Sequence, residues 1–366
     1  MSKSKKWFVD NVGENRIMSV AKIDRMNSPQ LGGAVSKIHM VLLALIPALS
    51  VMTYQFGFGT VINILISVTT ATVSEATILV LRKRPIRVHL NDLSSILTAV
   101  LLGLALPPLA PWWLIVIASL SSIVIAKQLY GNTGTGLFNP AMVGYAVVLL
   151  SFPLEMSAWI TPVSVLAEGI NHPNIFESFS IVFGMNDSVD GITGATPLDA
   201  FKQSNGLLVD QIYQTETVFS EAILAGVGWE FVNIAFLCGG FFLLQARIFS
   251  WHAPLAMLTT ITILAMLFWD GGSSVSAGYP LMHLFSGGTM MGAFFIITDP
   301  STSVKTNNAK LVYGALIGLF IFVIRAWGDY PDAVAFGVLL GNCAAPLIDF
   351  VSKNTTKISM EISDAE

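Results

Sequence analysis

One short polar stretch gathers the residue types that could carry a covalent group. It is Asp190–Asp199, which reads Asp-Gly-Ile-Thr-Gly-Ala-Thr-Pro-Leu-Asp. Gly191 and Gly194 let another molecule approach the backbone closely, and Thr193 and Thr196 offer two hydroxyls on the same stretch. A Thr hydroxyl is a weak nucleophile unless a partner activates it. If one of these hydroxyls carries a covalent group, a separate enzyme must install it.

Three charged residues in or beside apolar runs are further candidates. Glu75 lies inside the run 59–81, and a carboxylate at membrane depth is costly enough to be a functional candidate by default. It could line an ion path or contact another subunit. Asp349 closes the run 333–350, where the ordinary alternative is a charge at a helix end. Arg325 could pair with a phosphate or a nearby Asp, or extend outward from a helix end.

The composition indicates a membrane protein. Of 366 residues, 54% are hydrophobic and 11% are charged, whereas soluble domains carry roughly 25% charged residues. A soluble chain this apolar would expose large patches and aggregate. The small net charge of -4 says nothing about nucleic acid, but no basic patch with interleaved aromatics appears, so no nucleic-acid partner is expected.

The potential metal ligands are scattered. No His pair has helical ligand spacing, so no metal site is predicted. Cys238 and Cys343 lie in separate apolar runs without a Cys-x-x-Cys, which argues against an iron–sulfur cluster held by this chain alone. We expect both cysteines to be buried as small apolar residues. A disulfide between them is the alternative.

Ten apolar runs are candidates for membrane spans. They are about 38–56, 59–81, 92–107, 112–130, 138–153, 221–244, 253–269, 283–298, 311–326 and 333–350. The third, fifth and eighth are short for a span of ~20 residues, so we expect them to be tilted or broken. The chain then divides into a tail 1–37, a first half 38–153, an outer loop 154–220, a second half 221–350 and a tail 351–366.

The Lys and Arg residues predict the orientation. With the N-terminus in the cytoplasm, all of them except Lys202 and Arg325 fall on the inner side, as the positive-inside rule requires. Both termini are then cytoplasmic. Thr196 lies in the outer loop between the fifth and sixth runs, on the periplasmic side.

The two halves are expected to form an inverted repeat, because each has five runs and they therefore cross in opposite directions. The run 92–107 contains Gly103 and ends at Pro-Pro, and its counterpart 283–298 contains Gly287 and Gly288 and ends at Asp-Pro. Interrupted helices in matching places often mark a central site. The alternative is that Gly and Pro are common in membrane helices anyway.

Several motifs occur in an order that identifies a family. They are Ser28-Pro29, Pro107–Trp113, Ala126–Gly131, Phe138–Met142, Ala195–Asp199, Thr298–Pro300, Tyr330–Asp332 and Pro346–Asp349. From Ser28 to Asp349 the chain resembles the NqrB/RnfD family. Its members are membrane subunits of Rnf complexes (RnfD) and of sodium-pumping NADH:quinone oxidoreductases (NqrB). The tetrapeptide Thr-Gly-Ala-Thr alone would recur by chance.

The resemblance implies a covalent flavin. Asp-Gly-Ile-Thr-Gly-Ala-Thr looks like the signal at which a flavin transferase joins FMN through its phosphate to the last Thr, here Thr196. Asp190, Thr193, Gly194 and Ala195 would be the recognition context. The resemblance also implies a second, non-covalent flavin, riboflavin, but the sequence does not show where it binds.

The resemblance also implies a fold and an ion path. The family fold is similar to that of urea transporters, so we expect an all-α polytopic membrane protein of about ten helices. Glu75 and Asp349 resemble acidic positions associated with cation uptake, and Arg325 could pair with the flavin phosphate.

The leading hypothesis is a flavin-bearing component of a bacterial inner-membrane Rnf complex, with partner subunits A, B, C, E and G. It would pass electrons between ferredoxin and NAD, coupled to Na⁺ or H⁺ movement. Without a Gly-x-Gly-x-x-Gly after a strand, NADH is expected to bind elsewhere, so the chain alone has no complete active site. One alternative is the NqrB component of the quinone reductase, whose longer N-terminal extension makes it less favoured. The other is a small-solute channel, which explains inverted halves but not the Thr196 motif.

Overall fold

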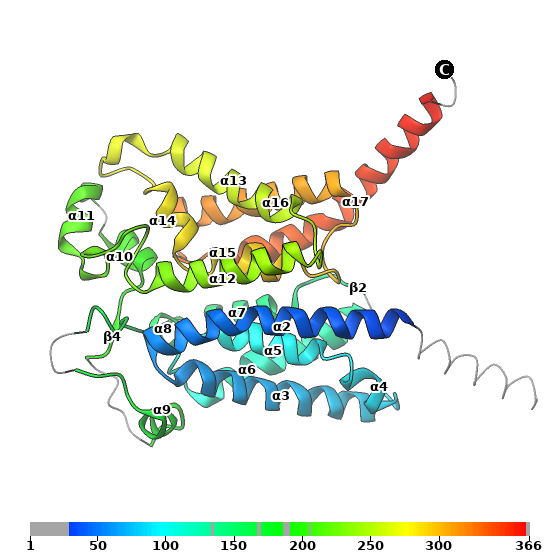
Figure 1. Cartoon of the computed structure of the whole chain (residues 1–366), viewed down its shortest axis with the longest axis horizontal. Helices are drawn as coiled ribbons and strands as arrows, with labels where there is room; N and C mark the ends of the chain where they lie inside the picture. Colours follow the sequence, from blue (N-terminus) through cyan, green and yellow to red (C-terminus); the bar gives the residue numbers. More distant parts are fainter. Residues whose placement is uncertain (1–28, 133–134, 167–169, 186–190, 205, 364–366) are drawn as a thin grey trace, which may run out of the picture.

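The computed structural model describes residues 29–132, 135–166, 170–185, 191–204 and 206–363, and it is mostly helical (Figure 1). Five helical segments in these ranges are long and apolar enough to cross a membrane: Val35–Phe56, Gly59–Leu81, Trp112–Leu129, Asn307–Trp327 and Val334–Asn354. Large apolar side chains on them, such as Leu65 and Leu347, are exposed, and lipid must cover such a surface. The chain is therefore a multi-pass membrane protein.

The helices form two groups that follow each other along the chain. The first group comprises α2 (Pro29–Phe56), α3 (Gly59–Leu81), α4 (Ile86–Leu90), α5 (Ser94–Ala105), α6 (Trp112–Leu120), the π-helical η1 (Ser121–Leu129), α7 (Pro140–Ser151) and α8 (Pro153–Ser157). The second comprises α12 (Trp229–Gln245), α13 (His252–Leu267), the short η3 (Asp270–Gly272), α14 (Pro280–Phe285), α15 (Thr289–Met291), the π-helical η4 (Gly292–Ile296), α16 (Asn307–Trp327) and α17 (Val334–Ser363).

Short elements connect the two groups, and a small hairpin lies within the first group. The connection contains β3 (Trp159–Ile160), α9 (Ile175–Val182), β4 (Thr193–Gly194), α10 (Pro197–Gln203), α11 (Val209–Thr215) and η2 (Thr217–Phe219). A small hairpin of β1 (Gly131–Asn132) and β2 (Thr135–Gly136) precedes α7. At that helix start, the Asn139 side chain accepts a bond from Met142 N, and Pro140 occupies the first turn, as expected of a well-capped helix.

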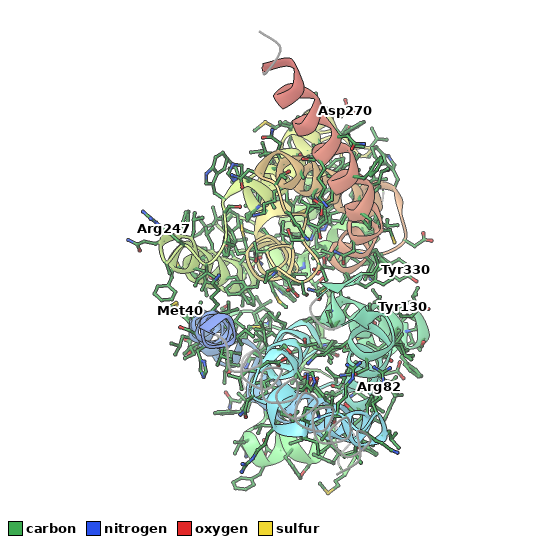
Figure 2. All side chains as sticks on the ribbon, turned by 90° about the vertical axis from the view of Figure 1, so that its right-hand side faces the viewer. Met40, Arg82, Tyr130, Arg247, Asp270 and Tyr330 are labelled. Atoms are coloured by element: carbon green, nitrogen blue, oxygen red, sulfur yellow. The ribbon has the colours of Figure 1, made fainter. Side chains whose placement is uncertain are left out.

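The two groups pack against each other along two helix pairs. Helix α2 contacts α12, and α7 contacts α17. Figure 2 looks along the spans and shows the groups as two clusters, with Arg82 and Tyr130 in one and Arg247 and Tyr330 in the other. The apolar core continues from one group into the other, so their boundary is a packed interface.

Several predicted runs agree with the helices, and others need correction. The run 59–81 matches α3, and 112–130 matches α6 and η1 together. The run 221–244 begins as a helix only at Trp229, because Gly228 has a positive φ of 79°. The first and last helices, α2 and α17, reach into the segments predicted as tails.

The third apolar run forms one short helix in the first group and is broken in the second. In the first group Leu93, with φ 59°, separates α4 from α5. In the second, Gly287, with φ 56°, lies between α14 and α15, so the run 283–298 is not one helix. The interruption expected in the run 283–298 is confirmed, whereas the run 92–107 is a short unbroken helix, α5. A ten-span inverted repeat and a urea-transporter-like fold stay predictions.

Both cysteines were predicted to be buried, and this is wrong. Cys238 on α12 and Cys343 on α17 are exposed, and neither forms a disulfide. Lipid-facing and core-facing helix surfaces are both apolar, so the sequence pattern around a small residue does not separate them.

Candidate functional site

Thr196 is the N-cap of α10 and shares a capping box with Asp199. Thr196 Oγ1 donates a 2.6 Å hydrogen bond to Asp199 Oδ2 and accepts one of 3.2 Å from Asp199 N. The Thr196 amide donates to the same carboxylate oxygen at 3.3 Å. Pro197 takes the first helical position, where its missing N–H costs nothing. The sequence Thr-Pro-Leu-Asp thus specifies a helix start.

The residues before Thr196 are fixed to the first group of helices by a short strand pair. Thr193 pairs with Ile160, and Gly194 pairs with Trp159. Thr193 and Ala195 are exposed, whereas Thr196 is only 8% exposed. A recognition enzyme could therefore contact Thr193 and Ala195 directly, but not the Thr196 hydroxyl. Asp190, also predicted to be part of the signal, lies outside the described residues.

Gly194 lies too close to a neighbouring side chain to carry one of its own. A Cβ at this position would lie 2.6 Å from Thr161 Oγ1. Thr161 follows β3, and its amide donates a 2.8 Å bond to Ile192 O. Thr161 would have to change rotamer to admit a larger residue at Gly194.

A cavity of about 280 Å³ opens beside Thr196, between the two groups of helices. The first group contributes Met52 and Tyr145 among others, β3 contributes Trp159, and the second group contributes Trp229, Asp332 and Ala335 among others. The rings of Trp159 and Trp229 meet edge to face with centroids 4.8 Å apart. Figure 1 shows why Thr196 is at this boundary: β4 lies at one end of the first group, and α10 lies at the same end of the second.

The polar wall of the cavity carries negative charge. Asp199 and Asp332 both line it. Burial raises the pKa of the Asp199 carboxyl, the hydrogen bonds from Thr196 oppose that rise, and the charge of Asp332 adds to it. Lys202 partly offsets this charge, and its own pKa is lowered by burial. Its Nζ donates to the carbonyl oxygens of Arg325 and Gly328, which ties α10 to the end of α16.

Arg325 is buried and paired with an acid. Its Nη2 lies 3.1 Å from Asp332 Oδ1, Nη1 donates to His283 O at 2.7 Å, and Nη2 also donates to Thr289 Oγ1 at 2.9 Å. The residue is 6% exposed, so the outward-extending alternative is wrong and the pairing with a nearby Asp is confirmed. Arg325 holds the α14–α15 break to Asp332; a contact with a flavin phosphate stays a prediction.

Glu75 is buried in an ion pair. Its Oε1 lies 2.6 Å from Lys127 Nζ, Ser95 donates to its other oxygen, and Gln128 donates at 3.3 Å. Lys127 also donates to Ser94 Oγ at 2.7 Å, at the start of α5. A lysine therefore compensates the carboxylate predicted for cation uptake.

Asp349 lies within α17, which continues to Ser363, so it does not stand at the end of its own helix. Its Oδ1 accepts a 3.0 Å bond from the backbone N of Lys305, just before α16. Neither Asp349 nor Glu75 is among the residues that line the cavity at Thr196. The structure thus separates the predicted flavin site from both predicted ion-path carboxylates.

Sequence reasoning missed most of the cavity wall. Trp159 lines the cavity. Asp332 accepts a 3.3 Å bond from Val334 N, faces the cavity and pairs with Arg325. Tyr145 and Trp229 carried no signal, because an aromatic residue in an apolar run is ordinary.

Comparisons with known proteins agree with the motifs. The family model described as "NQR2, RnfD, RnfE family" matches residues 32–357. A relative from Cellvibrio japonicus is 45% identical over 90% of this chain and 94% of its own length. One from Ectopseudomonas mendocina is 46% identical over 90% of this chain and 94% of its own length, and one from Vibrio cholerae is 46% identical over 87% and 93%. Each of the three is named as the D component of an ion-translocating oxidoreductase complex. The chain belongs to the NQR2, RnfD, RnfE family.

Proposed function

We propose that this chain is the RnfD component of an Rnf-type ion-translocating oxidoreductase and that it carries FMN joined through its phosphate to Thr196. The observation that carries the proposal is the position of Thr196: its side chain caps α10 at the edge of a cavity shared by both groups of helices. The names of the relatives support the type of complex.

The cavity suits a flat heteroaromatic ring. Its wall is mostly apolar and includes the rings of Tyr145, Trp159 and Trp229, which can stack on such a ring or meet it edge to face. Its volume of about 280 Å³ is near the lower end of the ~300–1,000 Å³ usual for small-molecule sites. The cavity has room for the ring system, and the ribityl and phosphate parts would extend towards Thr196. A bound flavin supplies one- and two-electron transfer, which the protein tunes by position and charge.

The residues of the chain would have separate tasks at this site. Thr196 Oγ1 holds the phosphate as an ester. Lys202, on the same short helix as Asp199, is the nearby cation that balances the added negative charge. The two Trp rings exclude water from the ring site. Asp199 and Asp332 keep the polar wall acidic, which disfavours accumulation of negative charge on a bound ring.

We also propose the topology and partners that the sequence predicts. The helices would cross the bacterial inner membrane ten times as two inverted halves, with both termini cytoplasmic and Thr196 periplasmic. The interruption at Gly287, in the third segment of the second half, and the short third helix of the first half, α5, support this arrangement. The partners would be subunits A, B, C, E and G, with a flavin transferase for maturation, riboflavin as a second flavin, and Na⁺ or H⁺ as the transported ion.

The experiment compares the purified complex containing the wild-type chain with one containing Thr196→Ala. We expect the variant complex to assemble and to retain NADH oxidation with an artificial acceptor, since NADH binds elsewhere. It should lose ferredoxin–NAD electron transfer and the coupled ion uptake into vesicles. Unchanged coupled ion uptake in Thr196→Ala would contradict the proposal and favour a non-redox channel.

A further inference from the structure

Helix α9 presents a stripe of aromatic residues away from the protein. Phe176 is 82% exposed, Phe179 is 47% exposed, and Phe183 directly after the helix is also exposed. The opposite side of the helix buries Ser178, Ile181 and Val182. At 100° per residue, the three Phe fall within one narrow arc of the helix surface. The exposed side of α9 is therefore more aromatic than its buried side, whereas a surface helix of a soluble protein exposes its polar side.

The charged and polar groups of α9 are engaged at its start. Asn174 Oδ1 accepts bonds from the amides of Phe176 and Glu177 at 3.0 Å each. Glu177 Oε2 accepts a 2.9 Å bond from Asn174 N. Glu177 is the one charged residue of the helix, and this capping box holds it at the N-terminus. The aromatic stripe itself carries no charge.

The helix lies across the spans rather than along them. Figure 1 shows α9 nearly end on, below the end of α3 that begins at Gly59, while α3 and α6 run across the view. The segment before α9 is held at that end, because His172 lies next to Gly57 and its Nε2 bonds to Thr161 O at 2.9 Å. In a multi-pass protein a helix in this position runs parallel to the membrane plane.

The stripe continues the lipid-facing surface of the spans. Helix α9 packs against α3, whose outward side chains Phe58 and Leu65 are exposed. The ring of Phe183 stacks on Trp112, with centroids 6.4 Å apart and planes at 11°, and Trp112 begins α6. Aromatic residues at the ends of spans typically mark the membrane–water interface, so α9 lies at that depth.

We propose that α9 is an interfacial helix whose Phe176 and Phe179 side chains enter the phospholipid bilayer, at the boundary between headgroups and acyl chains. Such helices bury their apolar face in this boundary and keep the polar face in water or against protein. With no basic residue on α9, the attraction is to the apolar boundary and not to anionic headgroups. The inference needs only the membrane location of the chain and does not rest on the flavin.

The consequence is an anchor for the segment that leads to Thr196. Helix α9 lies between β3 and β4 in the chain, and β4 holds Thr193 and Gly194. Insertion of the stripe would hold the segment between β3 and β4 at the lipid interface.

The test measures the environment of position 176 in the complete complex, reconstituted in vesicles of zwitterionic phospholipid. A nitroxide label is attached to Phe176→Cys in a Cys238→Ser, Cys343→Ser background. Its accessibility to oxygen, which dissolves in lipid, is compared with that to a water-soluble nickel chelate. Asp210→Cys, exposed on α11, is the water control, and Leu65→Cys, exposed on α3, is the lipid control.

We expect the label at 176 to favour oxygen over nickel, with a depth between those of the two controls. A label as accessible to nickel as at 210 would overturn the proposal. So would a label shielded from both reagents in the complex and freed in the isolated chain, since a partner subunit would then cover the stripe.

A second measurement needs no substitution. The wild-type complex in the same vesicles is photolabelled with a lipid-soluble aryl diazirine, and the modified residues are identified by mass spectrometry. Modification of Phe176 and Phe179 is expected. Modification of the spans without any in the peptide 170–185 would contradict the proposal.

Discussion

Thr196 Oγ1 donates its proton to Asp199 Oδ2 at 2.6 Å, and this bond cannot coexist with a phosphoester at the same oxygen. An esterified oxygen has no proton to donate, and the added phosphate places a negative charge beside the Asp199 carboxylate. The hydroxyl bond to Asp199 must therefore break when the flavin is attached, whereas the two backbone bonds of the capping box need no hydroxyl proton. Because the Thr196 residue is also nearly buried, attachment requires either local opening of α10 or a step that precedes the packing of the two groups of helices.

The first prediction concerns pH and Asp199. Burial raises the pKa of this carboxyl in the folded chain. A carboxyl with a raised folded pKa contributes stability that is fully present below its unfolded pKa and is lost as the pH rises through its folded pKa. As the pH rises from the unfolded pKa of Asp199 through its folded pKa, the unfolding temperature of the unflavinylated chain in detergent should fall. Asp199→Asn should make that fall smaller. Asp210→Asn, at an exposed position, should leave the fall in unfolding temperature unchanged. Equal falls in the wild type and both variants would contradict the burial argument.

The second prediction concerns the ion pair between Arg325 and Asp332. Replacing Arg325 with Met leaves Asp332 without its cation and the α14–α15 break without its donors. Removing one partner of a buried pair costs about 3 kcal/mol, so the unfolding midpoint in denaturant should fall clearly. Lys353→Met, at an exposed position, is the control. A snorkelling Arg325 would give the same small change as the control.

The third prediction separates structure from ion transport at Glu75. Glu75→Gln and Lys127→Met should each destabilise the chain by about 3 kcal/mol, because each leaves the other charge buried and unpaired. The double variant should recover most of that loss, which a double-mutant cycle measures. If Glu75 also lines the ion path, the stable double variant will still lack coupled ion uptake. Recovery of both stability and uptake would assign Glu75 a structural role alone.

The fourth prediction fills the cavity. Ala335 lines it from α17, and Ala335→Leu reduces the space for a ring without touching Thr196. The flavin should remain covalently attached, but its ring should become more accessible to iodide, as measured by fluorescence quenching of the native complex. Ala345→Leu, a buried position of the same helix outside the cavity, is the matched control. Equal quenching in both variants would argue that the ring lies elsewhere.

The helices were predictable where local signals agree. The bounds of α3 follow from the Phe-Gly turn before it and the charged residues after it, and the start of α7 follows from Asn139 and Pro140. The helix start at Thr196 could be read from Thr-Pro-Leu-Asp, because a capping box lies within four residues. Such features depend on residues close together in the sequence, so a single sequence is enough to predict them.

Features that depend on distant pairings were not predictable. Lys127 compensates Glu75 from another helix, and nothing local to either residue shows the pair. The cavity needs Trp159 from one group and Trp229 from the other, which only the packing of the groups brings together. The exposure of Cys238 and Cys343 was missed for a related reason, since lipid-facing and core-facing surfaces look alike in sequence.

The most direct measurement of the central claim is flavin fluorescence of the denatured chain in a gel, after co-expression with an active flavin transferase. The account predicts a fluorescent wild-type band and a dark Thr196→Ala band, with Thr193 intact in both. Mass spectrometry of the wild-type peptide should place the FMN phosphoryl group on Thr196. A dark wild-type band, or fluorescence that survives Thr196→Ala, would contradict the account.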